Sequence, residues 1–204
     1  MTQRVIIGID EVGRGPLAGP ITVAAVAATG NSKHEILNSK LKQELKNIKD
    51  SKKLSARQRE EWFLKLKEMP HAIASVSPAV IDAIGIAPAI RRAVRSCLKK
   101  LSSRFPLDPS RFTLLLDGSL YAPENYKNQQ TITKGDEKVP IIAVASVIAK
   151  VTRDRHMVRM HKKYPQYGFG VHKGYGTARH QQAIRTHGLC DIHRKTFCRK
   201  ILKT

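Results

Sequence analysis

RVIIGIDEVGRGPLAGPITVAAVAA, residues Arg4–Ala28, determines the class of fold that this chain adopts. Its two ends, Arg4–Ile9 and Ile21–Ala28, are β-branched or small apolar runs, which predict strands. The Gly- and Pro-rich segment Gly13–Pro20 lies between them and predicts a loop. The acidic pair Asp10-Glu11 follows the first predicted strand, so we expect two carboxylates where that strand gives way to the loop.

A second buried strand and a long helix are predicted further along the chain. The continuous apolar run Phe112–Leu116 is typical of a strand covered on both faces, and it is followed by Asp117. A helix is predicted over about residues 141–160, with one face packed and the opposite face polar. Three residues at i, i+4 and i+8 line the polar face: Ser146, Lys150 and Asp154.

The other segments complete an alternating pattern of strands and helices, which predicts an α/β fold. They comprise a helix from Ser55 to about Met69 with a capping box at its start, a strand over His71–Ser77, a basic amphipathic helix over about Ala87–Ser103, a possible hairpin around Lys134–Glu137, a Gly-rich loop over Gly168–Gly176, and a short helix from Thr177 to about His187. We expect one folding unit, in which a core of residues 1–160 carries a loop and helical segment of residues 161–204.

Charge indicates the class of partner. Lys and Arg number 37 against 16 Asp and Glu, which gives a net charge of +21. Such an excess points to a polyanion, with nucleic acid as the first candidate and an acidic membrane as the second. The longest apolar runs, Ile21–Ala28 and Val139–Val151, are too short or interrupted to span a bilayer, and the N-terminus lacks the features of a signal peptide. We therefore expect no membrane partner and a cytoplasmic location.

The cysteines favour a reducing compartment over a disulfide framework. Cys97, Cys190 and Cys198 are odd in number and form no CxxC pair. His187, Cys190, His193 and Cys198 fall within twelve residues and offer zinc-ligating atoms. Zinc fingers usually place a longer loop between their ligand pairs, so we interpret these residues as buried thiols and surface histidines.

Carboxylates grouped in so basic a chain need a compensating cation, because they repel one another. Asp10, Glu11, Asp117 and Asp154 are the acids that a parallel or mixed sheet could bring together. Hard oxygen ligands of this kind suit Mg²⁺ or Mn²⁺, and two such ions can hydrolyse a phosphodiester without a histidine base. Taken singly, each acid has an ordinary interpretation: Asp117 as a turn residue, and Asp154, between two arginines, as half of a surface ion pair.

These residues stand in segments that resemble the ribonuclease HII family along nearly the whole chain. The matching segments occur in the family's order: Gly8–Pro20, Asp50–Ser55, Leu116–Gly118, Ala145–Arg155, His172–Thr177 and His193-Arg194. Val12 after Glu11 is a small departure that leaves the acids in place. The resemblance implies a ribonuclease H-like mixed sheet flanked by helices, with a C-terminal helical segment.

The resemblance also implies an activity and residue roles. The expected enzyme hydrolyses the RNA strand of RNA/DNA hybrids and cuts on the 5′ side of single ribonucleotides in duplex DNA, acts as a monomer, and leaves a 3′-hydroxyl and a 5′-phosphate. Mg²⁺ or Mn²⁺ would be held by Asp10, Glu11, Asp117 and Asp154. Gly13-Arg14-Gly15 would approach the ribose 2′-hydroxyl, Tyr175 would pack on the next sugar, and Lys52, Lys53, Ser146 and Lys150 would contact phosphates.

Three rival interpretations remain. A non-catalytic RNA-binding protein would explain the charge but not the acids. A metal-independent ribonuclease would use two of the eight histidines as acid and base, and it would work in EDTA. A DNA-only nuclease of the same broad fold would share the acids but would have no use for the Gly13–Gly15 and Tyr175 readers of the ribose.

Overall fold

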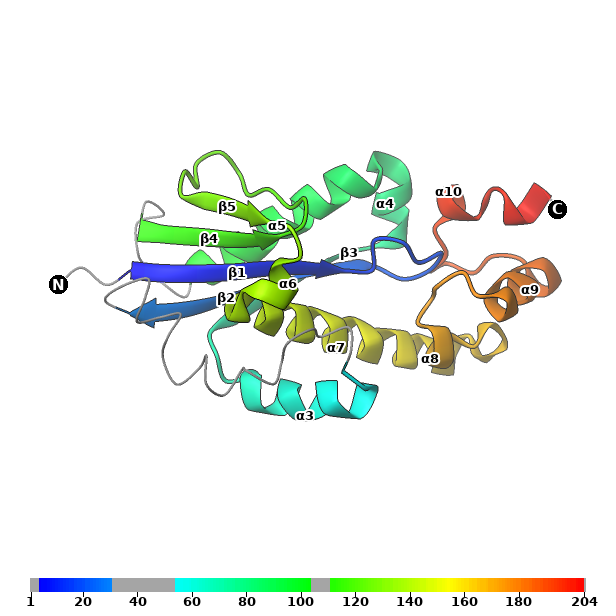
Figure 1. Cartoon of the computed structure of the whole chain (residues 1–204). Helices are drawn as coiled ribbons and strands as arrows, with labels where there is room; N and C mark the ends of the chain where they lie inside the picture. The colour runs from blue at the N-terminus through cyan, green and yellow to red at the C-terminus, as the bar shows by residue number, and fades with distance from the viewer. Residues whose placement is uncertain (1–3, 31–53, 104–110, 204) are drawn as a thin grey trace.

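The computed structural model describes residues 4–30, 54–103 and 111–203. Five strands form one sheet in the order β3-β2-β1-β4-β5 (Figure 1). Their bounds are β1 (Arg4–Val12), β2 (Ile21–Gly30), β3 (His71–Val76), β4 (Phe112–Asp117) and β5 (Gln129–Ile132). The β1/β2 and β2/β3 pairs are antiparallel, whereas β1/β4 and β4/β5 are parallel. The predicted α/β fold with a mixed sheet is therefore confirmed.

Helices cover both faces of the sheet. They are α3 (Ala56–Leu66), α4 (Pro78–Ile84), α5 (Ile86–Ser102), α6 (Gly135–Lys138), α7 (Pro140–Lys163), α8 (Phe169–His172), α9 (Ala178–His187) and α10 (Lys195–Cys198), with 3₁₀ turns at Pro165–Tyr167 and Ile201–Lys203. Helices α4 and α5 lie on one side of the sheet, and α7 with α3 lies on the other (Figure 1). Within the described ranges no helix is both long and apolar enough to cross a membrane.

The alternation of side chains along β1 divides the core in two. Val5, Ile7 and Ile9 point to the face that α5 covers, whereas Ile6 points to the face that α7 covers. Such alternation follows from the two-residue period of a strand. Burying apolar residues on both faces removes the central strands from water, and this holds the carboxyl ends of β1 and β4 in fixed positions.

A third apolar cluster joins the residues after α7 to the first half of the chain. Ala18 and Met157 pack there with Tyr167, Phe169 and Ile184. We call residues 164–203 the C-terminal segment; Figure 1 places its helices at the end of the sheet where β1 leads into β2. The predicted division into residues 1–160 and 161–204 stays a prediction, and this cluster draws on both parts.

Four local predictions differ from the structure. Asp10-Glu11 lie inside β1, which runs on to Val12 because it pairs with β2 along its whole length. Lys134–Glu137 is the start of the short helix α6 rather than a hairpin, and the Gly168–Gly176 loop contains α8. Helix α7 is buried on all sides from Ile141 to Ala149, because it crosses both β1 and β2, so its predicted polar face opens only from Lys150 onward.

Candidate active site

Parallel pairing of β1 and β4 brings two acids to adjacent positions. Ile9 pairs with Leu116, so Asp10 and Asp117 are the next residues along two neighbouring strands. Strand β5 pairs with β4 up to Ile132, and helix α6 begins three residues later, which places Asp136 at the same edge. Three segments that are distant in sequence therefore deliver carboxylates to one end of the sheet.

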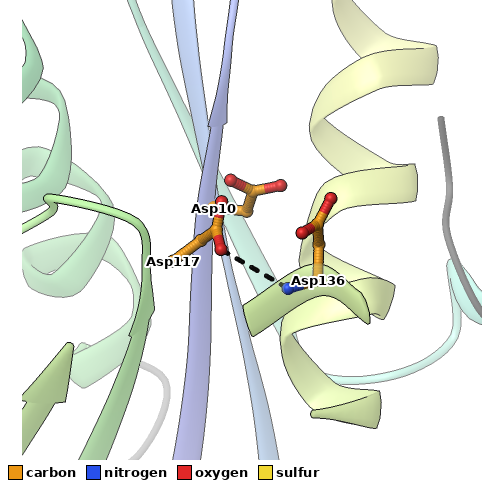
Figure 2. Close-up of side chains that lie close together, drawn as sticks. All are labelled: Asp10, Asp117 and Asp136. Carbon is orange, nitrogen blue, oxygen red and sulfur yellow. Dashed lines mark hydrogen bonds between the residues drawn. The ribbon is translucent and has the colours of Figure 1, made fainter. Parts of the chain in front are cut away.

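Asp10, Asp117 and Asp136 form one compact acidic cluster. A carboxylate oxygen from each lies within 4.8 Å of one from each of the others. The backbone N–H of Asp136 donates to Asp117 Oδ1 at 3.4 Å, as Figure 2 shows, and the N–H of Gly135 donates to the same oxygen at 2.6 Å. Helix α6 thus binds the carboxylate of Asp117 through its first N–H groups while its own acid points toward Asp10.

The carboxylates in and beside this cluster repel one another. Burial raises the pKa of Asp10 well above its usual value, the negative charge of Glu11 raises it further, and the charge of Asp117 adds to the rise. A hydrogen bond with Ser146 opposes these effects. Buried carboxylates that repel one another are stabilised in their ionised form by a cation, and oxygen ligands of this kind suit a hard divalent ion.

A cavity of 490 Å³ opens beside the acids. Arg59 lines it as well, a residue that the sequence did not single out. Nine of the residues predicted as ligands or substrate contacts also line it: Asp10, Glu11, Gly13, Arg14, Gly15, Asp117, Ser146, Lys150 and Tyr175. Side chains from β1, the following loop, β4, α7 and the C-terminal segment therefore converge on one space large enough for a nucleotide-sized group.

Asp154 lies outside the acidic cluster. Its carboxylate accepts a hydrogen bond from Lys150 Nζ at 2.9 Å, and it lines a neighbouring cavity with Arg155 and Lys173. Ser146 contacts Asp10, and Asp154 follows Ser146 by eight positions in the helix, which is about 12 Å along the axis. The helix therefore carries Asp154 away from the site that Ser146 faces.

Asp136 is the acid that the sequence interpretation missed. Its side chain is 1% exposed, so it is among the buried charged groups of the fold. In the sequence, Asp136 is marked only by the dipeptide Gly135-Asp136 just before the long helix. Strand β5, which leads to it, has four residues that are only partly buried, so it shows little of the apolar pattern that predicts a strand. Without β5, nothing in the local sequence aligns Asp136 with Asp117.

Two lysines predicted to contact phosphates and the four histidines and cysteines near the C-terminus lie apart from the acidic cluster or beyond the described residues. Lys52 and Lys53 lie outside the described residues. Cys190 Sγ lies 3.1 Å from His193 Nδ1, but residues 4–30, 54–103 and 111–203 contain no zinc-like group of three or more such ligands. His193 is buried, contrary to the expectation of a surface histidine, because its ring packs against Tyr167 and Phe169.

Comparison with known proteins identifies relatives that match nearly the whole chain. A sequence profile described as Ribonuclease HII matches residues 7–200. A Ribonuclease HII from Chlorobaculum parvum is 44% identical over 194 residues, which cover 94% of this chain and 88% of that protein. The structure resembles the ribonuclease H2 from Pyrococcus horikoshii OT3 with 27% identity and a TM-score of 0.72, over 98% of this chain and 97% of that one. It also resembles a Bst-RNase HIII in complex with Mn²⁺, with a TM-score of 0.74 over 98% of this chain and 70% of that one; at 20% identity this likeness concerns the fold alone.

Proposed function

Because the chain belongs to the ribonuclease HII family, we propose that the acidic cluster at the end of β1 and β4 is its catalytic centre. The protein is an endonuclease that hydrolyses the RNA strand of RNA/DNA hybrids. The finer part of the proposal is that it also cuts on the 5′ side of single ribonucleotides in duplex DNA and leaves a 3′-hydroxyl and a 5′-phosphate. The observation that carries this proposal is a cluster of three buried or half-buried acids, two of which, Asp10 and Asp117, line a cavity, in a chain of charge +21.

The donor set fits a divalent cation. Asp10, Asp117 and Asp136 offer hard oxygen ligands, and Glu11 lines the same cavity. We assign the ligand role to these four acids, with Asp136 in the place for which the sequence suggested Asp154. These acids would hold Mg²⁺ or Mn²⁺, and a divalent ion in this place would activate water for attack and offset negative charge on the leaving oxygen.

Other residues of the chain orient the substrate. Ser146 holds Asp10 by a hydrogen bond, so that this carboxylate keeps one position while its ligand is bound. Lys150 lies 5.9 Å from the centre of the Tyr175 ring, and this cation is placed to contact a phosphate beside the sugar that packs on Tyr175. Gly13, Arg14 and Gly15 approach the ribose, whose 2′-hydroxyl distinguishes RNA from DNA.

A cleavage assay tests the proposal. The substrate is a labelled DNA duplex with one ribonucleotide, assayed with Mg²⁺, with Mn²⁺ and with EDTA beside an all-DNA control. We expect a metal-dependent cut on the 5′ side of the ribonucleotide and none in the control. Cleavage in EDTA would support the metal-independent alternative, and binding without any cut would support a non-catalytic binder.

The partner is a nucleic acid, in line with the net charge of +21. RNA/DNA hybrids and ribonucleotide-containing duplexes are the proposed forms of that partner, and a monomer is the proposed state. The cytoplasmic location stays a prediction, with which the three free cysteines agree.

A further inference from the structure

Two arginines are completely buried beside the candidate active site. Arg153 on α7 and Arg194 in the C-terminal segment are both 0% exposed. Within the described part of the chain, no carboxylate oxygen lies within 4.0 Å of either guanidinium. A buried charge without such a partner is costly unless hydrogen bonds satisfy it, so these two residues need an explanation.

Backbone carbonyls of the loop between β1 and β2 bind both guanidiniums. Arg194 donates to the carbonyl oxygens of Gly13 at 2.6 Å, Arg14 at 2.9 Å and Gly19 at 2.9 and 3.0 Å. Arg153 donates to Ala18, Pro20 and Lys173, each at 3.0 Å. The two guanidiniums therefore hold the loop in one conformation. We call Arg153 and Arg194, with these hydrogen bonds, the arginine frame.

This frame determines which way the peptide N–H groups of the loop point. A trans peptide is planar, so the N–H of each residue points away from the carbonyl of the residue before it. Because Arg194 holds the carbonyls of Gly13 and Arg14 toward the interior, the N–H groups of Arg14 and Gly15 face the opposite way. Neither N–H donates a hydrogen bond to another described residue, and both residues line the cavity beside Asp10.

Two of the glycines in the loop, Gly13 and Gly15, have different surroundings on its two sides. A Cβ on Gly13 would lie 2.3 Å from Arg153 Nε, and its φ of +93° is one that side chains rarely adopt. A Cβ on Gly15 would meet no protein atom within 4 Å. A larger residue at position 13 would therefore collide with Arg153, whereas the space beside Gly15 is open toward the cavity.

The charge of the frame adds to its effect. Burial lowers the pKa of Arg194 to about 10, and the nearby charge of Arg153 contributes. Arg194 therefore stays protonated at neutral pH. Two cations in a medium of low dielectric directly behind the loop also favour an anion, such as a phosphate, in front of it.

From this geometry we infer that Arg194, supported by Arg153, is a positioning residue for ribose recognition: it turns the N–H groups of Arg14 and Gly15 toward the substrate. The inference rests on the proposed function, because it names the means by which the same site selects a ribonucleotide. It predicts that Arg194 affects selectivity for the ribose more than affinity for a duplex.

The first test is Arg194→Lys, which keeps the charge but cannot hold several carbonyls in a fork. We expect kcat/KM on the single-ribonucleotide duplex to fall by about tenfold or more, the loss typical of a displaced hydrogen-bonding group. Affinity for an all-DNA duplex in EDTA should change less than twofold. Arg159→Lys, an exposed change on α7, the helix that carries Arg153, is the matched control and should leave kcat/KM unchanged.

Two outcomes would overturn the inference. One is an unchanged kcat/KM in Arg194→Lys. The other is an equal loss in Leu98→Ala, whose side chain is buried on α5, on the face of the sheet that α7 does not cover, and whose loss of stability serves as a reference. Equal losses would assign Arg194 a merely structural role.

A second measurement uses the unaltered chain, since a variant of a buried arginine can fail to fold. With ¹⁵N-labelled glycine and arginine, the amide signals of Arg14 and Gly15 should shift more with the ribonucleotide duplex than with the all-DNA duplex, both in EDTA. Equal shifts would contradict the inference. If the unaltered chain cuts neither duplex with metal, the proposed function fails instead, so the two failures are distinguishable.

Discussion

The acidic cluster and the arginine frame bury opposite charges within one site and stabilise them in different ways. Around Asp10, carboxylates are gathered until burial and mutual repulsion raise the pKa, and a solute cation is needed to relieve this repulsion. Around Arg194, neutral carbonyls of the chain itself satisfy the guanidinium. The first region is completed by a ligand, whereas the second is complete once the chain has folded.

This difference separates what each region contributes. Substitutions in the acidic cluster should affect cleavage and metal binding more than folding, because the folded chain gains little from repelling charges. Substitutions that disturb the arginine frame should affect folding or selectivity, because its hydrogen bonds define the shape of the loop. The predictions below test this division in order of decreasing effect.

Asp136→Asn, compared with Asp154→Asn, tests which acid belongs to the acidic cluster. We expect Asp136→Asn to lower the single-turnover cleavage rate by about a thousandfold or more, since a bound metal ion contributes several kcal/mol to transition-state stabilisation. Asp154→Asn loses only a half-buried ion pair with Lys150 and should change the rate by about fivefold at most. Calorimetric titration with Mn²⁺ provides the second readout. Equal losses of rate in the two variants would return Asp154 to the ligand set.

Gly13→Ala tests the packing of the loop against Arg153. The positive φ and the contact with Arg153 Nε should together destabilise the fold by about 3 kcal/mol, measured by urea unfolding. Gly118→Ala is the matched control, since Gly118 also has a positive φ, +58°, but no protein atom near the added Cβ. It should cost about 1 kcal/mol. A similar loss of stability in both variants would show that the Arg153 side chain moves aside at no cost in the free energy of unfolding.

Gly15→Ala tests the outer side of the same loop. Gly15 does not have a positive φ, and its added Cβ meets no protein atom, so stability should stay within about 0.5 kcal/mol. The methyl group enters the space that the substrate must occupy, and kcat/KM on the ribonucleotide duplex should fall about tenfold. Unchanged cleavage would mean that the substrate does not approach the loop at this point.

The buried histidines of the C-terminal segment supply a test by pH. His193 Nδ1 accepts from the N–H of Cys190, His193 and His180 share a 3.1 Å hydrogen bond through their Nε2 atoms, and His180 Nδ1 lies 2.9 Å from the carbonyl oxygen of Tyr175. In this series of hydrogen bonds every ring nitrogen has a partner when both histidine rings are neutral. Burial is the main cause that lowers the pKa of each to about 4.

Between pH 4 and 6.5 the unfolded chain therefore binds more protons than the folded one, so stability falls as the pH drops through this window. We expect a loss of about 1 kcal/mol per histidine between pH 7 and 5.5. His180→Gln should flatten this dependence, whereas His187→Gln, at an exposed position, should not. Urea unfolding over a pH series measures both, and an unaltered slope in His180→Gln would refute the assignment.

Most of the fold could be predicted because its central elements carry strong local patterns. The apolar runs of β1 and β4 and the helical spacing of α5 are visible in the sequence, and the capping box at Ser55 forms as predicted. These patterns reflect local geometry, the two-residue period of a strand and the 3.6-residue period of a helix. Both Asp10 and Asp117 could be assigned to the site for the same reason.

Asp136 and the arginine frame could not be predicted because they depend on contacts between distant segments. Asp136 reaches the acidic cluster only because the short, half-polar β5 pairs with β4. Arginine is almost never fully buried, so local pattern places Arg153 in a surface ion pair and gives Arg194 no particular role. Their burial follows from carbonyls more than 130 residues earlier in the chain.

The hydrogen bond from Arg194 to Gly13 also affects the order in which the parts of the site can form while the polypeptide is being synthesised. During synthesis the loop after β1 leaves the ribosome early, but its frame is finished only when residue 194 has emerged, 181 positions later. The strands can pair sooner, since β5, the last of them, ends at Ile132. A nascent chain would thus hold its acids together before it could read a ribose, and full selectivity would arrive last.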